Sequence, residues 1–247
     1  FNYRNNLLAS DHLVNNAVNH GVKCFVFTSS IAVYGDARPP FGERGVPIPA
    51  DSYGIAKYAT EEELRITKKL FGLDYVIFRP HNVYGERQNI GDKYRNVIGI
   101  FMNQVLRGEP ISIFGDGKQV RAFTYIGDIA GPLAASAFRP ECYGQVFNIG
   151  SDARATVNRV AAEVCRVFGV KPGLRHLPPR VEAKYAWSKH DKARRFFPQV
   201  RETPLSEGVR RMAAWVTRHG ARESRDFGEL EIEKYLPSGW RPKKSSR

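Results

Sequence analysis

A tyrosine and a lysine stand four residues apart in the segment Tyr53-Gly54-Ile55-Ala56-Lys57. In a helix capped by Asp51 or Ser52, this spacing places both side chains on one face, a turn apart. A phenol has an ordinary pKa of about 10, and a nearby ammonium favours the phenolate, which is a base. The pair could therefore take a proton from a substrate hydroxyl, although the same spacing is also typical of an ordinary helix surface pair.

Short apolar runs predict the strands that position this pair. Cys24-Phe25-Val26-Phe27 leads into Thr28-Ser29-Ser30, and Tyr53 lies 23 residues beyond Ser30. Two further runs, at 74–79 and 145–150, also predict buried parallel strands. Ser30 would then lie at the carboxyl end of a strand, where α/β sheets bind their ligands, and could hold the substrate oxygen.

The serine after the strand, the Tyr-x-x-x-Lys pair and Arg79-Pro80-His81-Asn82-Val83-Tyr84-Gly85 together resemble the extended short-chain dehydrogenase/reductase family. The branch they resemble is that of the nucleotide-sugar epimerases and dehydratases, such as UDP-glucose 4-epimerase. The likeness runs from Asn6 to about Arg195. It implies a catalytic set and an NAD cofactor. The catalytic residues so implied are Ser30, Tyr53 and Lys57, and the cofactor-binding residues are Asn6, Ser29, Tyr53, Lys57 and Pro80.

The resemblance also implies residues that bind a nucleotide sugar. Asn82 would bond the sugar diphosphate, Asn96 the nucleotide and Phe114 the nucleobase, while Arg121 and Arg180 would bind phosphate. A planar guanidinium binds phosphate oxygens through two parallel hydrogen bonds. Ala122 stands where the family has an Asp after the arginine, which affects how Arg121 is oriented. For His81 we expect a role in packing or in positioning the backbone.

Alternation of strands and helices predicts an α/β fold. It is the C-terminal part of a doubly wound, Rossmann-like parallel sheet with a smaller α/β substrate-binding domain. We expect the NAD-binding part at 1–92 and 121–150, the substrate-binding part at 93–120 and 151–236, and a disordered basic tail at 237–247. Helices are expected at 3–20, 51–71, 128–137 and 204–218, and Asp116-Gly117 predicts a hairpin turn between two strands.

One part of the family pattern is missing from this chain. The family carries a Gly-x-x-Gly-x-x-Gly loop about three βα units, or roughly 90 residues, before the catalytic strand. Nothing between Phe1 and that strand matches it. We therefore expect the chain to be the C-terminal part of a longer protein and to be inactive by itself.

Composition and charge indicate which classes of partner the protein binds. The net charge is +13 and the pI about 9.8, yet no zinc-finger spacing, aromatic RNP motif or basic zipper accompanies the charge, so we expect no nucleic-acid partner. The positive field would instead attract an anionic substrate. No apolar run near 18 residues and no signal-peptide pattern is present, which predicts no membrane association. Three scattered cysteines indicate reduced thiols and a cytoplasmic location.

The function implied is NAD-dependent C4 epimerisation of a UDP-glucose/UDP-galactose-type sugar through a 4-keto intermediate. Sugar 4,6-dehydratases and decarboxylases of the same family are the alternatives. Those enzymes carry acidic residues where Ile31 and Ala32 stand here, which favours the epimerase. A non-catalytic fragment that binds nucleotide sugar or RNA is a further alternative. The resemblance also implies a homodimer through the helices at 3–20 and 51–71.

Overall fold

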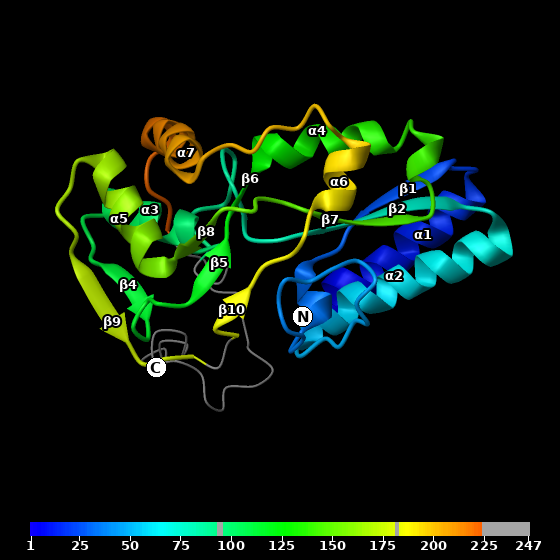
Figure 1. Ribbon diagram of the computed structural model, residues 1–247, viewed down its shortest axis with the longest axis horizontal. Coiled ribbons are helices and arrows are strands. Elements are labelled where there is room, and N and C mark those ends of the chain that lie inside the picture. The colour runs from blue at the N-terminus through cyan, green and yellow to red at the C-terminus, as the bar shows by residue number, and fades with distance from the viewer. Residues whose placement is uncertain (93–95, 181–182, 224–247) are drawn as a thin grey trace, which may run out of the picture. The chain divides into compact units, whose positions relative to one another are not determined.

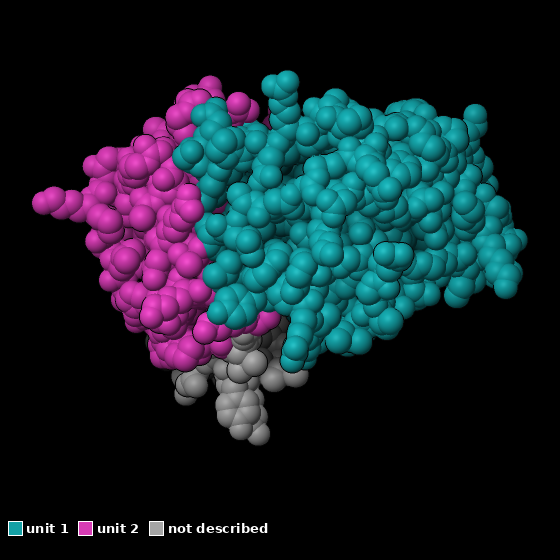
Figure 2. Space-filling model, viewed as in Figure 1, with its two compact units in different colours: residues 1–85, 120–155, 185–208 teal, residues 86–119, 156–184, 209–247 magenta. Residues whose placement is uncertain are grey.

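The computed structural model describes residues 1–92, 96–180 and 183–223. The chain forms two compact units, coloured separately in Figure 2. Unit 1 comprises 1–85, 120–155 and 185–208, and unit 2 comprises 86–119, 156–184 and the chain from 209 onward. Which unit serves a cofactor and which a substrate stays a prediction. The expected basic tail at 237–247 lies outside the described residues.

Unit 1 is built on a parallel sheet with strand order β1-β2-β7. The strands are β1 (Cys24–Thr28), β2 (Asp74–Pro80) and β7 (Gln145–Ile149), at the three expected places. Thr28 is paired with Phe78, and Pro80 with Ile149, so the carboxyl ends of all three strands meet at one edge. The predicted α/β class with a parallel sheet is confirmed.

Helices cover both faces of this sheet (Figure 1). Alternate β2 side chains point to opposite faces, as the strand period requires. Tyr75 and Ile77 pack against α1 (Ala9–Asn19) and α2 (Ser52–Phe71). Val76 and Phe78 pack on the other face, against apolar residues of α4 and α6. Those helices span Ile126–Ser136 and Asp191–Phe196.

Helix α2 begins and ends where its sequence indicates. The Asp51 carboxylate accepts a hydrogen bond of 2.6 Å from the Gly54 amide, so the predicted cap is confirmed. At the other end Gly72 adopts a left-handed φ of 78°, which a residue with a side chain rarely tolerates. The expected single helix at 3–20 is instead a π-helical turn (Tyr3–Leu8) followed by α1.

Shorter elements complete unit 1. A 3-10 helix at Ile31–Tyr34 follows β1, and another lies at Pro140–Cys142. Strand β3 (Val83–Tyr84) pairs in parallel with β6 (Thr124–Tyr125). Strand β5 (Val120–Ala122) lies between β10 (Tyr185–Ala186) and β8 (Arg154–Thr156). Helix α4 begins at Ile126, two residues earlier than expected, so Asp128 lies within its first turn.

Unit 2 contains a two-stranded parallel sheet and packed helices. The strands are β4 (Ile111–Phe114) and β9 (Leu174–Leu177). Helix α3 (Val97–Leu106) carries Asn96 as its cap, and α5 (Val157–Phe168) carries Thr156. Helix α7 spans Leu205–His219 and belongs to unit 2 from Val209 onward. Within the described ranges, none of the helices is both long and apolar enough to cross a membrane.

The predicted hairpin at Asp116-Gly117 is wrong. Strand β4 pairs with β9, and β5 belongs to a different sheet, so the two strands that flank the turn do not pair with each other. Asn158 at the start of α5 holds the turn instead: its side chain donates to the Asp116 carbonyl at 2.9 Å and its amide to Gly117 at 3.1 Å. A local turn signal cannot reveal which distant segment will bond its carbonyls.

Candidate active site

Ser30 lies just beyond β1, at the edge where the strands of the parallel sheet end. Its backbone is extended, and its hydroxyl accepts a hydrogen bond of 3.1 Å from the Ala32 amide, capping the 3-10 helix. A serine hydroxyl that accepts one bond still has its own hydrogen to donate. Ser30 is therefore fixed in place by the turn and can still donate to a substrate oxygen.

Tyr53 and Lys57 lie on one face of α2, as their spacing requires. The Lys57 ammonium lies 5.7 Å from the centre of the Tyr53 ring and donates a 3.0 Å hydrogen bond to the Thr28 carbonyl at the end of β1. Burial lowers the pKa of Lys57. The contact between Lys57 and Thr28 brings the first turns of α2 to the strand end that carries Ser30.

Gly54 allows this close approach, and sequence reasoning missed it. A Cβ at Gly54 would lie 2.6 Å from the Ala32 carbonyl oxygen, closer than real contacts allow. The next small residue on the same helix, Ala56, is fully buried. The absence of a side chain at Gly54 thus lets α2 press against the turn that follows Ser30. The signal was present as the Gly and Ala of the Tyr-Gly-Ile-Ala-Lys segment.

A buried ion pair connects α2 to strand β2. Arg79 donates to the Glu61 carboxylate through Nε at 2.8 Å and through Nη2 at 2.5 Å, and both side chains are at most 2% exposed. Ser29 also donates to Glu61, at 2.6 Å. Arg79 Nη1 donates to Tyr34 at 2.8 Å. We refer to this group, completed by the Asn148 side chain that accepts from Tyr34 at 2.8 Å, as the Glu61 cluster.

The Glu61 cluster ties together the ends of all three strands. Ser29 follows β1, Arg79 belongs to β2 and Asn148 to β7, while Glu61 comes from α2. Asn148 extends the cluster to the loop at 36–50, because its side chain donates to the Phe41 carbonyl at 3.2 Å. Sequence reasoning did not single out Glu61, although it stands one helical turn beyond Lys57 on the same face. That spacing was an available signal.

The cofactor residues that the resemblance implied lie near this edge in different settings. Ser29 is 2% exposed, its hydroxyl donates to Glu61 and its amide donates to the Phe78 carbonyl at 2.7 Å. Pro80 ends β2. Asn6 lies in the π-helical turn, and its carbonyl accepts a 3.3 Å bond from Thr60 of α2. Their roles toward NAD stay predictions.

Two of the predicted substrate residues, Asn82 and Arg121, lie in unit 1 on either side of one backbone contact. Asn82 adopts a left-handed φ of 41°, and its side chain donates to the Ala122 carbonyl at 2.9 Å. His81 contacts the same oxygen at 2.9 Å through Nδ1. Arg121 precedes that carbonyl on β5 and donates to its neighbour's carbonyl, at Val120, with a 2.9 Å bond. The structure thus brings Asn82 next to the backbone of Arg121.

The other three predicted substrate residues, Asn96, Phe114 and Arg180, lie in unit 2. The Arg180 guanidinium lies 3.3 Å from the centre of the Phe114 ring, so the cation stacks on the aromatic face. Asn96 caps α3, with its side chain accepting from the Ile98 amide at 3.2 Å. Phe114 and Arg180 therefore meet, and Asn96 has a capping role of its own.

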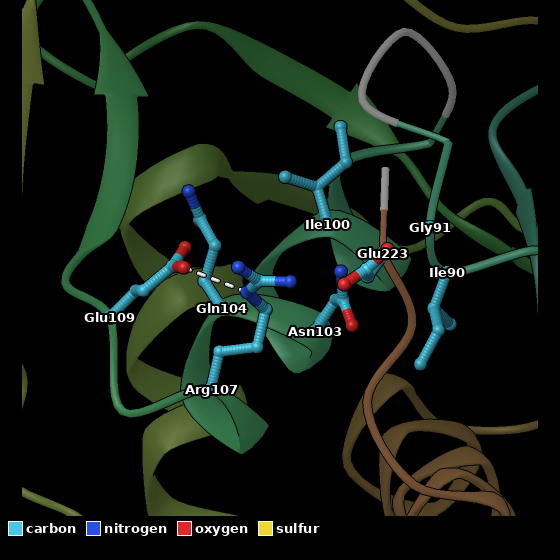
Figure 3. Close-up of a pocket in the computed structure, with 8 residues that line it drawn as sticks. All are labelled: Ile90, Gly91, Ile100, Asn103, Gln104, Arg107, Glu109 and Glu223. Carbon is cyan, nitrogen blue, oxygen red and sulfur yellow. Dashed lines mark hydrogen bonds and ion pairs between the residues drawn. The ribbon is translucent and has the colours of Figure 1, made fainter. Parts of the chain in front are cut away.

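Unit 2 also has a hollow of about 360 Å³, which is lined by other residues than Asn96, Phe114 and Arg180 (Figure 3). Its lining includes Arg107 and Glu109, which form a 2.7 Å ion pair, and Asn103. The Asn103 side chain exchanges hydrogen bonds of 2.8 and 2.9 Å with the Arg222 backbone. Arg107, Glu109 and Asn103 are thus already paired, and the lining contains none of the predicted site residues.

Comparison with known proteins supports the same family. Residues 2–150 match the model of the NAD dependent epimerase/dehydratase family, and the chain belongs to that family. A curated relative described as an uncharacterized UDP-glucose epimerase, from Bacillus subtilis, is 31% identical over 214 residues. The match covers 86% of this chain and 66% of that relative, so the chain spans about two thirds of its length.

Solved structures of this family share the fold. UDP-N-acetylglucosamine 4-epimerase from Methanobrevibacter ruminantium, in complex with UDP-N-acetylmuramic acid, gives a TM-score of 0.82 at 30% identity. That match covers 88% of this chain and 70% of the other. UDP-glucose 4-epimerase from Thermus thermophilus, in complex with NAD, gives 0.79 at 28% identity, covering 87% and 70%. The recognition of the family from sequence is confirmed.

Proposed function

We propose that the protein containing this chain is an NAD-dependent epimerase that inverts C4 of a UDP-hexose. The observation that carries the proposal is the geometry around Lys57, which bonds the carbonyl of Thr28 and lies 5.7 Å from the Tyr53 ring centre. The phenol, the ammonium and the Ser30 hydroxyl lie toward the carboxyl ends of a parallel sheet, and such edges are where α/β folds bind ligands, which supports the proposal. The sugars after which the relatives are named, UDP-glucose and UDP-N-acetylglucosamine, support the UDP-sugar class.

In this proposal Tyr53, Ser30 and Lys57 divide the proton chemistry among them, and Lys57 also meets the cofactor. Tyr53, as phenolate, takes the proton of the C4 hydroxyl, and Ser30 donates a hydrogen bond to the same oxygen. Lys57 favours the phenolate through its charge. Its ammonium has three hydrogens, of which Thr28 takes one, so it can also hold a ribose hydroxyl of NAD. NAD, when bound, supplies a hydride acceptor at C4.

Ile31 and Ala32 favour epimerisation over dehydration. Both belong to the 3-10 helix that follows Ser30, where the dehydratases that this chain resembles carry acidic residues. A dehydratase needs a base to remove the proton at C5. An apolar pair cannot perform that transfer, whereas C4 inversion requires only the proton at the C4 oxygen and the hydride.

The test is to run the complete gene product in heavy water with UDP-glucose or UDP-N-acetylglucosamine. We expect the C4 epimer to form, and NMR of the product should show no deuterium at C4 or C5. Tyr53→Phe should lower kcat by about 10²- to 10⁴-fold, the usual contribution of a positioned acid or base. Tyr58→Phe, on the next turn of α2, is the matched control. Deuterium at C5 or a 4-keto-6-deoxy product would decide for a dehydratase.

A homodimer through α1 and α2 is also part of the proposal. Several large apolar side chains on or next to these helices are exposed, which is typical of an interaction surface when they are contiguous. They include Leu8, Leu13, Ile66, Leu70 and Phe71, which are 53–65% exposed. Sedimentation of the complete protein should give a dimer that Leu70→Glu weakens. A monomer at micromolar concentration would contradict this part of the proposal. The cytoplasmic location stays a prediction.

A further inference from the structure

Two buried histidines face each other next to the strand that carries Arg121. His81 follows β2 and His190 precedes α6, and each is 2% exposed. Their Nε2 atoms lie 2.9 Å apart. His81 Nδ1 lies 2.9 Å from the Ala122 carbonyl oxygen, and His190 Nδ1 lies 2.7 Å from Asp152 Oδ1. We refer to these contacts as the His190 chain, which runs from the loop after β7 to the backbone beside Arg121.

The His190 chain has three contacts and needs one hydrogen in each. The carbonyl oxygen and the carboxylate at its two ends only accept hydrogen bonds. Two neutral imidazoles bring two hydrogens, and the carboxylate brings none. Whichever tautomers the neutral rings adopt, one contact therefore brings two acceptors together. The arrangement is complete only when the chain holds one additional proton.

Charges around the rings decide where that proton goes. Burial lowers the pKa of His81 to about 4, so His81 remains neutral at pH 7. Burial also lowers the pKa of His190, but Asp152 and the more distant Glu43 oppose that shift. Asp152 is held as a carboxylate because hydrogen bonds from His190 and Arg194 outweigh its own burial and lower its pKa. The additional proton therefore enters on His190, beside the carboxylate.

Other groups around the rings are uncharged or already paired. The Ser188 hydroxyl lies 2.9 Å from His190 Nε2 and can donate or accept there. The Thr124 hydroxyl lies 3.4 Å from His81 Nδ1. Arg194 also donates to Asp191 at 2.7 Å, and this second carboxylate offsets part of the positive charge near His190. Each hydroxyl contacts a nitrogen of one ring only. Neither can therefore supply the hydrogen that the neutral chain lacks in one of its three contacts.

We propose that His190 and Asp152 are positioning residues for the diphosphate-binding strand. Protonated His190 donates to His81, and His81 then donates through Nδ1 to the Ala122 carbonyl. Asn82 donates to the same carbonyl, so the completed chain holds both Asn82 and the backbone after Arg121. The consequence for ligand affinity rests on the proposed function, in which Asn82 and Arg121 bind a UDP-sugar. Loss of the proton as pH rises opens one contact and loosens the strand.

Asp152→Asn separates this role from a merely structural one. The new carboxamide can donate to His190 Nδ1, which leaves Nε2–H of a neutral His190 to donate to His81. Amide and two neutral rings then bring the three hydrogens that the chain needs. The substitution nearly conserves shape, and its carbonyl can still accept from Arg194. It should therefore complete the chain at every pH and remove its pH dependence.

The experiment has two measurements on the complete gene product. The first is an NMR titration of ¹⁵N-labelled imidazoles between pH 4.5 and 8, which does not depend on the proposed function. We expect one buried ring to take up a proton in the wild type below the ordinary histidine pKa of about 6.5, and none to do so in Asp152→Asn. Two buried rings that stay neutral throughout the wild-type titration would overturn the proposal.

The second measurement is calorimetric binding of UDP-glucose at pH 5.0 and 7.5. The probe is a diphosphate diester, so it lacks the phosphate ionisation near pH 6 that free UDP would add. Wild-type affinity should be about 3- to 10-fold higher at pH 5.0, the worth of one net hydrogen bond. Asp152→Asn should bind at both pH values as tightly as the wild type at pH 5.0, and His12→Gln, at an exposed helix position, should follow the wild type.

The outcomes distinguish the proposal from the function on which it rests. Equal wild-type affinity at both pH values, with the proton seen by NMR, overturns the positioning role and leaves the epimerase proposal standing. Absence of UDP-glucose binding at every pH overturns the proposed substrate and with it the effect on affinity. In that case the titration alone decides whether the His190 chain holds its additional proton.

Discussion

Two buried polar groups of unit 1 connect the strand ends to the loops that follow, and they do so with different chemistry. The Glu61 cluster joins Glu61 to Arg79, whose guanidinium keeps its charge at any pH the fold withstands. The His190 chain joins His81 to Asp152 through His190 and lacks one hydrogen when both rings are neutral. We therefore expect support for Tyr53 and Lys57 to be insensitive to pH, and support for Arg121 to depend on it.

The largest effect should come from Glu61→Leu. It removes one partner of a buried ion pair and leaves Arg79 charged and uncompensated, which typically costs about 3 to 5 kcal/mol of unfolding free energy. Urea denaturation at pH 7 measures it. Glu62→Leu is the control on the same helix, because the Glu62 side chain is 45% exposed and its ion pair with Arg65 lies at the surface. Equal losses in the two variants would refute the distinction.

Arg121→Ala tests the strand that the His190 chain serves. The proposed bonds to the diphosphate are charge-assisted, so UDP-glucose binding should weaken by about 1.5 to 3 kcal/mol. Calorimetry on the complete protein measures it, and NAD affinity should not change. Lys118→Ala, at an exposed turn two residues before β5, is the control for a general loss of positive charge. An unchanged affinity in Arg121→Ala would show that the predicted substrate residues are misplaced.

Tyr34→Phe tests the rim of the Glu61 cluster. The hydroxyl accepts from Arg79 and donates to Asn148, and its loss leaves two buried polar groups short of a partner. Such groups cost about 1 to 3 kcal/mol of unfolding free energy. Because burial raises the pKa of Tyr34, its hydroxyl is neutral and the loss should be the same at pH 6 and pH 8. Tyr3→Phe, at an exposed position, should change stability little.

The most gradual effect is the dependence of stability on pH, and it should come from the His190 chain. The pKa of His81 is lowered to about 4 in the folded protein and is near 6.5 when unfolded, so the unfolded chain binds more protons between these values. Stability is therefore complete above about pH 6.5 and falls as pH drops toward 4, by at most about 1.4 kcal/mol per pH unit. Urea denaturation at pH 7.0 and 5.0 measures it. His81→Phe should flatten the slope, while Glu61→Leu should retain it.

Local signals predicted much of the fold. Asp51 as a cap, Gly72 as a helix end and the three apolar strands all follow from rules that act within a few residues. The hairpin at Asp116-Gly117 failed under the same kind of rule, because Asn158 holds that turn from more than 40 residues away, with the Asp116 carbonyl as its acceptor. Propensity describes what a segment can form, and tertiary contacts select among the options.

The sequence by itself determined which residue types stand where chemistry could occur. The spacing of Tyr53 and Lys57 follows from the helix period, and the position of Ser30 from the end of an apolar strand. Only the tertiary structure decided how these residues are supported. The bond between Glu61 and Arg79 and the contact between His81 and His190 join segments that the sequence separates by 18 and 109 residues. Such pairings depend on how strands order in a sheet and on which side chains burial forces to find partners, and no local pattern encodes either.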